Sequence, residues 1–245
     1  MIHLFGDSWG YSYNYDVGKD DDQIFGECLA EQLSNITNQP AKNHSERGFS
    51  NLRSLNKFRK ILPSISTSDT VIILQTDPLR SIFVPWFRHP EYLDDYTLNP
   101  PTRVNLIEIS DILLDEFYSR LAQLQQQTQL KIILHGGCSK LNHTLAEKYN
   151  LSYTKKTSTE ILIPDYKDCY FFNAPYLVMV RDHLMNTSYY KDNTDIVWSS
   201  IDEVESKFKL WAENNNIFSK NHTTPYGTEL VAKYLADFLQ QNSTN

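Results

Sequence analysis

Three short apolar runs constrain the fold more than any other feature of the sequence: Met1–Phe5, Asp69–Leu74 and Lys131–His135. Such runs, rich in Leu, Ile and Val and without regular alternation, are typical of strands buried on both faces of a parallel sheet. Helix-like segments separate them along the chain. The alternation predicts an α/β fold, a three-layer sandwich with a mainly parallel central sheet and helices on both faces.

Helical spacing of apolar residues predicts the helices. We expect them at Gln23–Leu33, Asn51–Leu62, Leu106–Gln127, Leu141–Tyr149, Ile201–Asn214 and Thr228–Leu239. Asn51 is a plausible N-cap, and the apolar run Thr159–Ile163 predicts a further strand or edge. Because no repeat and no Ser/Gly linker occurs, we expect a single domain over residues 1–245, with an aromatic loop inserted around residues 78–101.

Composition and motifs exclude several classes of function. The 245 residues carry a formal net charge of −7 and a pI of about 5.5, which disfavours nucleic acid and anionic membranes as partners. Neither GxGxxG nor GxxxxGK[ST] occurs, and no CxxC or HExxH motif is present, so we expect no cofactor and no metal. No apolar run is long enough for a membrane span, and the N-terminus does not resemble a signal peptide, so we expect a cytoplasmic protein. Its oligomeric state stays open.

Polar residues at the carboxyl ends of the expected strands are the first candidates for a site. Gly6, Asp7 and Ser8 directly follow the first strand. A serine on a tight turn there can direct its hydroxyl into a cleft and its N–H at a developing oxyanion, although an Asp-Ser turn with only local hydrogen bonds is the other reading. A serine nucleophile needs a base such as histidine, and His222 stands out because it lies in a loop just before the last helix.

Four segments resemble, in order, the four blocks that define the SGNH (GDSL-type) hydrolases. Gly6–Ser8 is similar to the first block, which holds the nucleophile, and Arg47–Asn51 resembles the second, whose glycine N–H lines the oxyanion hole. Gln75–Pro78 follows a strand where the third block belongs, and Lys220–His222 resembles the last block, which supplies the base. The resemblance spans the whole chain and implies an SGNH/flavodoxin-like fold with serine hydrolase activity.

The resemblance also implies roles for individual residues. Ser8 is the expected nucleophile and His222 the expected base, while the N–H groups of Ser8 and Gly48 and the hydroxyl of Thr76 would form the oxyanion hole. The implied reaction is cleavage of an O-acyl ester of a small molecule or a carbohydrate, such as an O-acetyl group. Some segments are also similar to SGNH-like proteins encoded by phages and bacteria, so the expectation extends to a phage-encoded member.

The third block departs from the family pattern, because Thr76 stands where the family has an oxyanion-hole asparagine. Loss of one such donor can cost about 10²–10³ in rate, and Asn51 or Gln75 could take its place. Asp7 and Asp77 are further supporting candidates. For both, the commoner role of an aspartate in such a turn is to cap it.

The last block departs at Ser219, which stands three residues before His222 where the family has the aspartate that orients the imidazole. We rank a Ser–His dyad first, with Ser219 as a possible support. The alternatives are a recruited carboxylate such as Glu213 and an impaired site. A lesser departure is Thr223, which replaces the proline that follows the family's histidine.

Three residues are candidates for a substrate wall: Trp9, Arg80 and Trp86. Two other functions remain open beside the esterase. The departures favour a catalytically impaired SGNH-like module that binds a glycan or a protein partner. The same chemistry would also suit a transferase that passes the acyl group to an alcohol instead of water.

Overall fold

The computed structural model describes residues 1–11, 13–15, 23–25, 27–46, 49–76, 78, 103–137, 141–162, 218–219 and 222–242. Two expected segments lie outside these residues: the helix at 201–214 and nearly all of the aromatic loop around 78–101.

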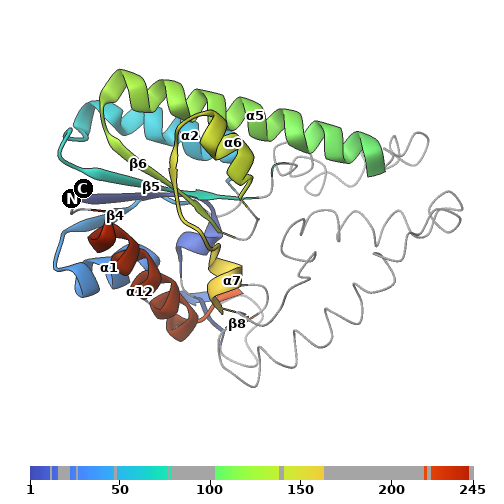
Figure 1. Ribbon diagram of the computed structural model, residues 1–245. Coiled ribbons are helices and arrows are strands. Elements are labelled where there is room, and N and C mark those ends of the chain that lie inside the picture. Colours follow the sequence, from blue (N-terminus) through green and yellow to red (C-terminus); the bar gives the residue numbers. More distant parts are fainter. Residues whose placement is uncertain are drawn as a thin grey trace, which may run out of the picture.

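Parallel strands form the centre of the molecule (Figure 1). Within the described residues the sheet has five strands, in the order β4-β1-β5-β6-β7. They are β1 (Ile2–Phe5), β4 (Ala41–Asn43), β5 (Thr70–Gln75), β6 (Lys131–Gly136) and β7 (Ser152–Tyr153). All neighbouring pairs run parallel, which confirms the predicted α/β fold class. Counted along the chain, this order is that of flavodoxin-like doubly wound sheets.

Helices cover both faces of the sheet, as Figure 1 shows. One face carries α1 (Leu29–Thr37) and α12 (Pro225–Gln241), which pack against each other. The other carries α2 (Asn51–Ile61), α5 (Arg103–Thr128) and α6 (His143–Lys148).

Strand residues alternate between the two cores. Leu4, Ile72 and Ile133 belong to the core under α1 and α12. Their neighbours Phe5, Ile73 and Leu134 belong to the opposite core. Burial of each such side chain contributes about 1.5–3 kcal/mol, and burial on both faces explains why the strands read as continuous apolar runs.

Shorter elements surround the carboxyl ends of the strands. They are the 3-10 turn η1 (Ser8–Gly10), the antiparallel pair β2 (Tyr13–Tyr15) and β3 (Gln23–Phe25), and the antiparallel pair β8 (Phe218–Ser219) and β9 (His222–Thr223). β2 contacts β8, and β9 contacts η1. The remaining short elements are η2 (Leu62–Ser64) and α7 (Ser158–Leu162). No helix within the described residues is long and apolar enough to cross a membrane.

The helix predicted over Gln23–Leu33 is wrong in its first half. Residues 23–25 form β3, paired with β2, and α1 begins only at Leu29. Pairing with Tyr13–Tyr15 overrides the helical spacing of Ile24 with the residues that follow. The true start is marked by Glu31, whose carboxylate accepts a hydrogen bond from the N–H of Cys28 at 2.6 Å.

The strand predicted over Thr159–Ile163 is also wrong, because Ser158–Leu162 forms the helix α7. Thr157 and Glu160 cap it reciprocally: the Thr157 N–H donates to the Glu160 carboxylate at 2.8 Å, and the Glu160 N–H donates to the Thr157 hydroxyl at 3.1 Å. A smaller correction concerns α2, whose N-cap is Ser50 and not Asn51.

Candidate functional site

The strand order places a topological switch point between β1 and β5. From β1 the chain goes first to its neighbour β4 and then to β5 on the opposite side. Ligands of such sheets bind in the crevice outside the carboxyl ends of the strands at this point. Gly6–Ser8 follow β1 there, and Thr76 follows β5. The first and third segments that resemble SGNH blocks therefore meet.

Asp7, a residue only 1% exposed, joins the two strand ends through its carboxylate. Its Oδ1 accepts the N–H of Trp9 at 3.0 Å, and its Oδ2 accepts the hydroxyl of Thr76 at 2.8 Å. The carbonyl oxygen of Asp7 accepts the N–H of Gly10 at 3.1 Å. Asp7 thus caps the turn η1, as expected from the sequence, and also ties that turn to β5.

Asn51 clamps the main chain of Thr76 from the first turn of α2. Its Oδ1 accepts the Thr76 N–H at 2.8 Å, and its Nδ2 donates to the Thr76 carbonyl oxygen at 2.9 Å. Both donors of Thr76 therefore have partners within the chain, since the hydroxyl donates to Asp7. This arrangement does not fit the oxyanion-hole role expected for Thr76, and it gives Asn51 a structural task.

Close packing explains the glycine before Asp7. A Cβ at Gly6 would lie 2.6 Å from the Cβ of Leu74 on β5, closer than real side chains approach. From the sequence alone, Gly6 is expected only to permit the sharp turn before Ser8. The structure instead requires glycine because β1 and β5 pass too close for any side chain, and the Gly6 backbone is not in the left-handed region.

The segment of His222 lies against the segment of Ser8. The hydroxyl of Thr223 donates to the carbonyl oxygen of Tyr11 at 3.2 Å, although the two residues are 212 positions apart. β9, which contains His222, contacts η1, which begins at Ser8. Contrary to the expectation from the sequence, His222 is not in a loop. It lies instead in a two-stranded ribbon in which Ser219 and His222 are direct cross-strand partners.

The residues just before Arg47–Asn51, the second SGNH-like segment, are hydrogen-bonded to the chain on either side of the turn η1. The Glu46 N–H donates to the Gly6 carbonyl oxygen at 3.1 Å, and the Asn43 side chain donates to the Gly10 carbonyl oxygen at 3.1 Å. The Tyr11 hydroxyl donates to the carbonyl oxygen of Ser45 at 2.8 Å. Burial is the main cause that raises the pKa of Tyr11, so its phenol keeps this donor proton.

Other candidate residues have different outcomes. Trp9, expected in a substrate wall, is 8% exposed and packs in the core under α1 and α12, so the wall role is corrected to a core role. Burial of its large ring in that core explains this. Five further candidates lie outside the described residues: Gly48, Asp77, Arg80, Trp86 and Glu213.

Gln75, the last residue of β5, is hydrogen-bonded toward the helices α5 and α6. Its Oε1 accepts the hydroxyl of Tyr118 at 2.7 Å, and that hydroxyl in turn accepts the N–H of Asn142 at 3.1 Å. Burial raises the pKa of Tyr118, which keeps the phenol protonated as a donor. The Gln75 side chain is therefore joined to α5 and to the residue before α6.

One Ser–His contact that the sequence analysis did not predict is buried in the interior. His135 on β6 is 0% exposed, and its Nε2 lies 2.9 Å from the hydroxyl of Ser158. Its Nδ1 lies 2.7 Å from the hydroxyl of Thr154, which donates its own proton to Lys156 O, so Nδ1 carries the proton. Burial lowers the pKa of His135 to about 3. A neutral imidazole thus joins α7 to the sheet, and no substrate reaches it.

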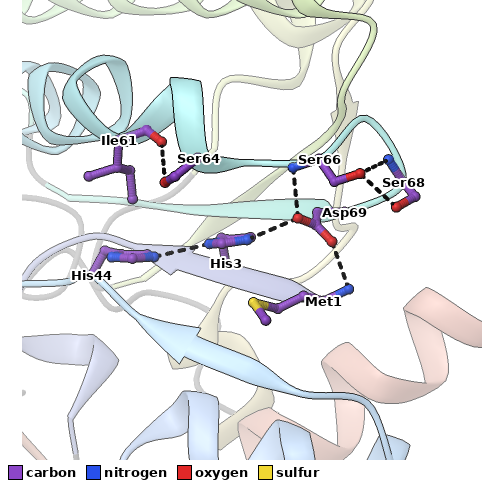
Figure 2. Close-up of polar contacts among 8 residues, drawn as sticks. All are labelled: Met1, His3, His44, Ile61, Ser64, Ser66, Ser68 and Asp69. Atoms are coloured by element: carbon purple, nitrogen blue, oxygen red, sulfur yellow. Dashed lines mark hydrogen bonds and ion pairs between the residues drawn. The ribbon is translucent and has the colours of Figure 1, made fainter.

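Another histidine group joins β1, the residue that follows β4 and the residue that precedes β5 (Figure 2). His3 Nδ1 lies 3.0 Å from His44 Nε2, and His3 Nε2 lies 3.3 Å from Asp69, which also pairs with the amino group of Met1. Burial, followed by the charges of His3, Lys42 and Lys57, lowers the pKa of His44 to about 4. This group connects the start of β1 to the start of β5.

Among the residues that the structure describes, no group of three or more His, Cys, Asp or Glu side chains could hold a metal ion. The sequence matches no protein-family model, and no curated protein is significantly similar to it.

Proposed function

We propose that this chain is a serine hydrolase in which Ser8 is the nucleophile and His222 the base. The observation that carries the proposal is the hydrogen bond from Thr223 to Tyr11, which holds the neighbours of His222 and Ser8 together at the switch point of the sheet. The convergence of the Gly6–Ser8, Glu46 and Thr76 segments at the same point supports it.

The reaction proposed is the cleavage of an O-acyl ester. The hydroxyl oxygen of Ser8 attacks the acyl carbonyl carbon while His222 accepts the hydroxyl proton. The proton passes to the leaving alcohol as its C–O bond breaks, which leaves an acyl ester on Ser8. Water, deprotonated by His222, then attacks this ester. The bond between the acyl carbon and the Ser8 oxygen breaks, Ser8 takes the proton back from His222, and the carboxylic acid is released. An O-acetylated carbohydrate is the substrate class we favour, by resemblance to SGNH hydrolases.

Charge on the developing oxyanion would be stabilised by main-chain groups. The N–H groups of Ser8 and Gly48 are the proposed donors. Additional support comes from α2, because its first residue, Asn51, is hydrogen-bonded to Thr76 and the helix therefore begins beside the site. The N-terminus of a helix carries a partial positive charge, which favours an adjacent anion.

Fluorophosphonate labelling tests the proposal directly. An activated serine displaces fluoride and forms a phosphonyl ester, which peptide mapping would locate at Ser8. We expect this label on the wild-type chain and its loss in Ser8→Ala and in His222→Ala. The matched control is Ser158→Ala, which removes the sealed serine beside His135 and should leave the labelling of Ser8 intact.

A folded wild-type chain that takes no label would contradict the hydrolase and favour the second candidate, an SGNH-like module that binds a glycan or a protein partner. One observation favours that candidate: both hydrogen-bond donors of Thr76, which replaces the family's oxyanion asparagine, are committed to Asn51 and Asp7. Labelling together with ester formation from an added alcohol would identify a transferase instead.

A further inference from the structure

The residue after His222 has a role that its sequence position does not reveal. Thr223 is 2% exposed, and its hydroxyl makes two hydrogen bonds. It donates to the carbonyl oxygen of Tyr11 at 3.2 Å, and it accepts the hydroxyl of Thr228, on the first turns of α12, at 2.9 Å. A proline, which SGNH hydrolases have after the histidine, could make neither bond.

The two bonds connect three elements in a line. Thr228 belongs to α12, whose start is fixed by the N-cap Thr224, and α12 packs on α1 and the sheet core. Thr223 belongs to β9, next to His222. Tyr11 follows η1, and its own hydroxyl reaches Ser45 at 2.8 Å. The rigid core thus holds β9 against the turn that carries Ser8.

We infer that Thr223 is a positioning residue: its hydroxyl latches the strand of His222 onto the Ser8 turn and thereby sets the spacing between base and nucleophile. The inference rests on the proposed function. A displacement of about 1 Å between reacting groups can cost about 10²-fold in rate. Because the latch acts on the placement of the base, its loss should lower kcat and leave KM nearly unchanged.

Thr223→Val tests the latch, because valine keeps the shape and removes both hydrogen bonds. We expect the rate of fluorophosphonate labelling at Ser8, and kcat for an acyl ester, to fall by about 10–10²-fold. Thr223→Ser, which keeps the hydroxyl, should restore most of the rate. The matched control is Thr128→Val at the end of α5, where the hydroxyl likewise donates to a carbonyl oxygen, that of Leu124 at 2.7 Å, and accepts one hydrogen bond.

Hydrogen exchange separates the failure of the latch from the failure of the proposed function. In Thr223→Val, amides around Tyr11 and in the first turn of α12 should exchange faster, while Thr223→Ser should match the wild type. A wild-type labelling rate in Thr223→Val would overturn the inference and leave the hydrolase standing. An unlabelled wild-type chain would overturn the hydrolase and the catalytic role of Thr223 together, and exchange would then report only whether the latch exists.

Discussion

The carboxylate of Asp7 shows how a residue that looks catalytic can have a structural role. Both of its oxygens accept hydrogen bonds inside the protein, one from the turn that follows and one from Thr76. A buried carboxylate needs such donors because leaving it without them costs several kcal/mol. Asp7 therefore fixes the turn on which Ser8 stands.

Replacement of Thr76 by valine should destabilise the fold. Valine has nearly the same shape but removes the hydroxyl that donates to Asp7, so the free energy of unfolding should fall by about 1–3 kcal/mol. Thr76→Ser, which keeps the donor, should lose much less. Urea unfolding of the two variants measures the difference. Equal stability of the valine and serine variants would show that the Asp7–Thr76 bond contributes little.

The turn that follows β1 could be predicted from the sequence, but the residues that bond to it could not. The capping role of Asp7 follows from a strand that ends in Gly-Asp-Ser, a local signal. The Thr76 hydroxyl and the Asn51 clamp could not be predicted, because they depend on β1 and β5 being neighbours and on where α2 begins. The core role of Trp9 could not be predicted for the same reason, since the core that it joins is built from strands and helices distant in the sequence.

Among the elements, the ribbon of β8 and β9 has the clearest consequence for the proposed chemistry. Its register pairs Ser219 with His222. Directly opposite residues of an antiparallel pair share one face of the ribbon, with Cβ atoms about 4.5–5.5 Å apart. The register therefore makes position 219 a candidate for a group that supports His222 in the proposed reaction.

Ser219→Asp should raise the activity. In the proposed reaction, a carboxylate opposite His222 would stabilise the imidazolium, so we expect kcat to increase about tenfold or more and the acidic limb of the pH–rate profile to shift to higher pH. Ser219→Asn is the control, because it has a similar size and no charge. Rates measured across a pH series decide the question, and equal effects of aspartate and asparagine would contradict the electrostatic explanation.

The elements themselves were predictable to different degrees. β5 and β6 were found because their runs are apolar and β-branched, and the last helix because its apolar residues keep helical spacing. The edge strands β4 and β7 were not predicted, since Ala41–Asn43 and Ser152–Tyr153 are short and partly polar and become strands only by pairing with β1 and β6. The capping pair Thr157 and Glu160 was a readable signal for α7 that the apolar run obscured.

At the scale of the whole molecule, two neutral histidines make stability depend on pH. The pKa of His44 is lowered to about 4 and that of His135 to about 3, both chiefly by burial, from an ordinary value of 6.5. Between the lowered pKa values of the folded chain and the ordinary value of 6.5, these two histidines bind protons in the unfolded chain but not in the folded chain. Their contribution to stability is therefore complete above about pH 6.5 and is lost as the pH falls toward 4 and below.

Thermal unfolding between neutral pH and about pH 4 checks the direction of this pH dependence. We expect Tm to fall steadily from neutral pH to about pH 4, and to fall less steeply in His44→Gln, which removes one of the two groups. The control is His143→Gln, since His143 is exposed on α6 and should leave the slope unchanged. A Tm that rises as the solution is acidified from pH 6.5 would contradict the assignment.

The clamp on Thr76 implies a particular sensitivity to chemical ageing. Asn51 works because its carboxamide presents one acceptor and one donor to the same main-chain unit. Hydrolysis of the carboxamide, which takes up water and releases ammonia, would convert this residue to aspartate and turn the donor into a second acceptor, facing a carbonyl oxygen. Hydrolytic damage at this one amide would thus loosen the contact between α2 and the end of β5 in stored protein, whereas the same reaction at the exposed Asn38 would leave that contact intact.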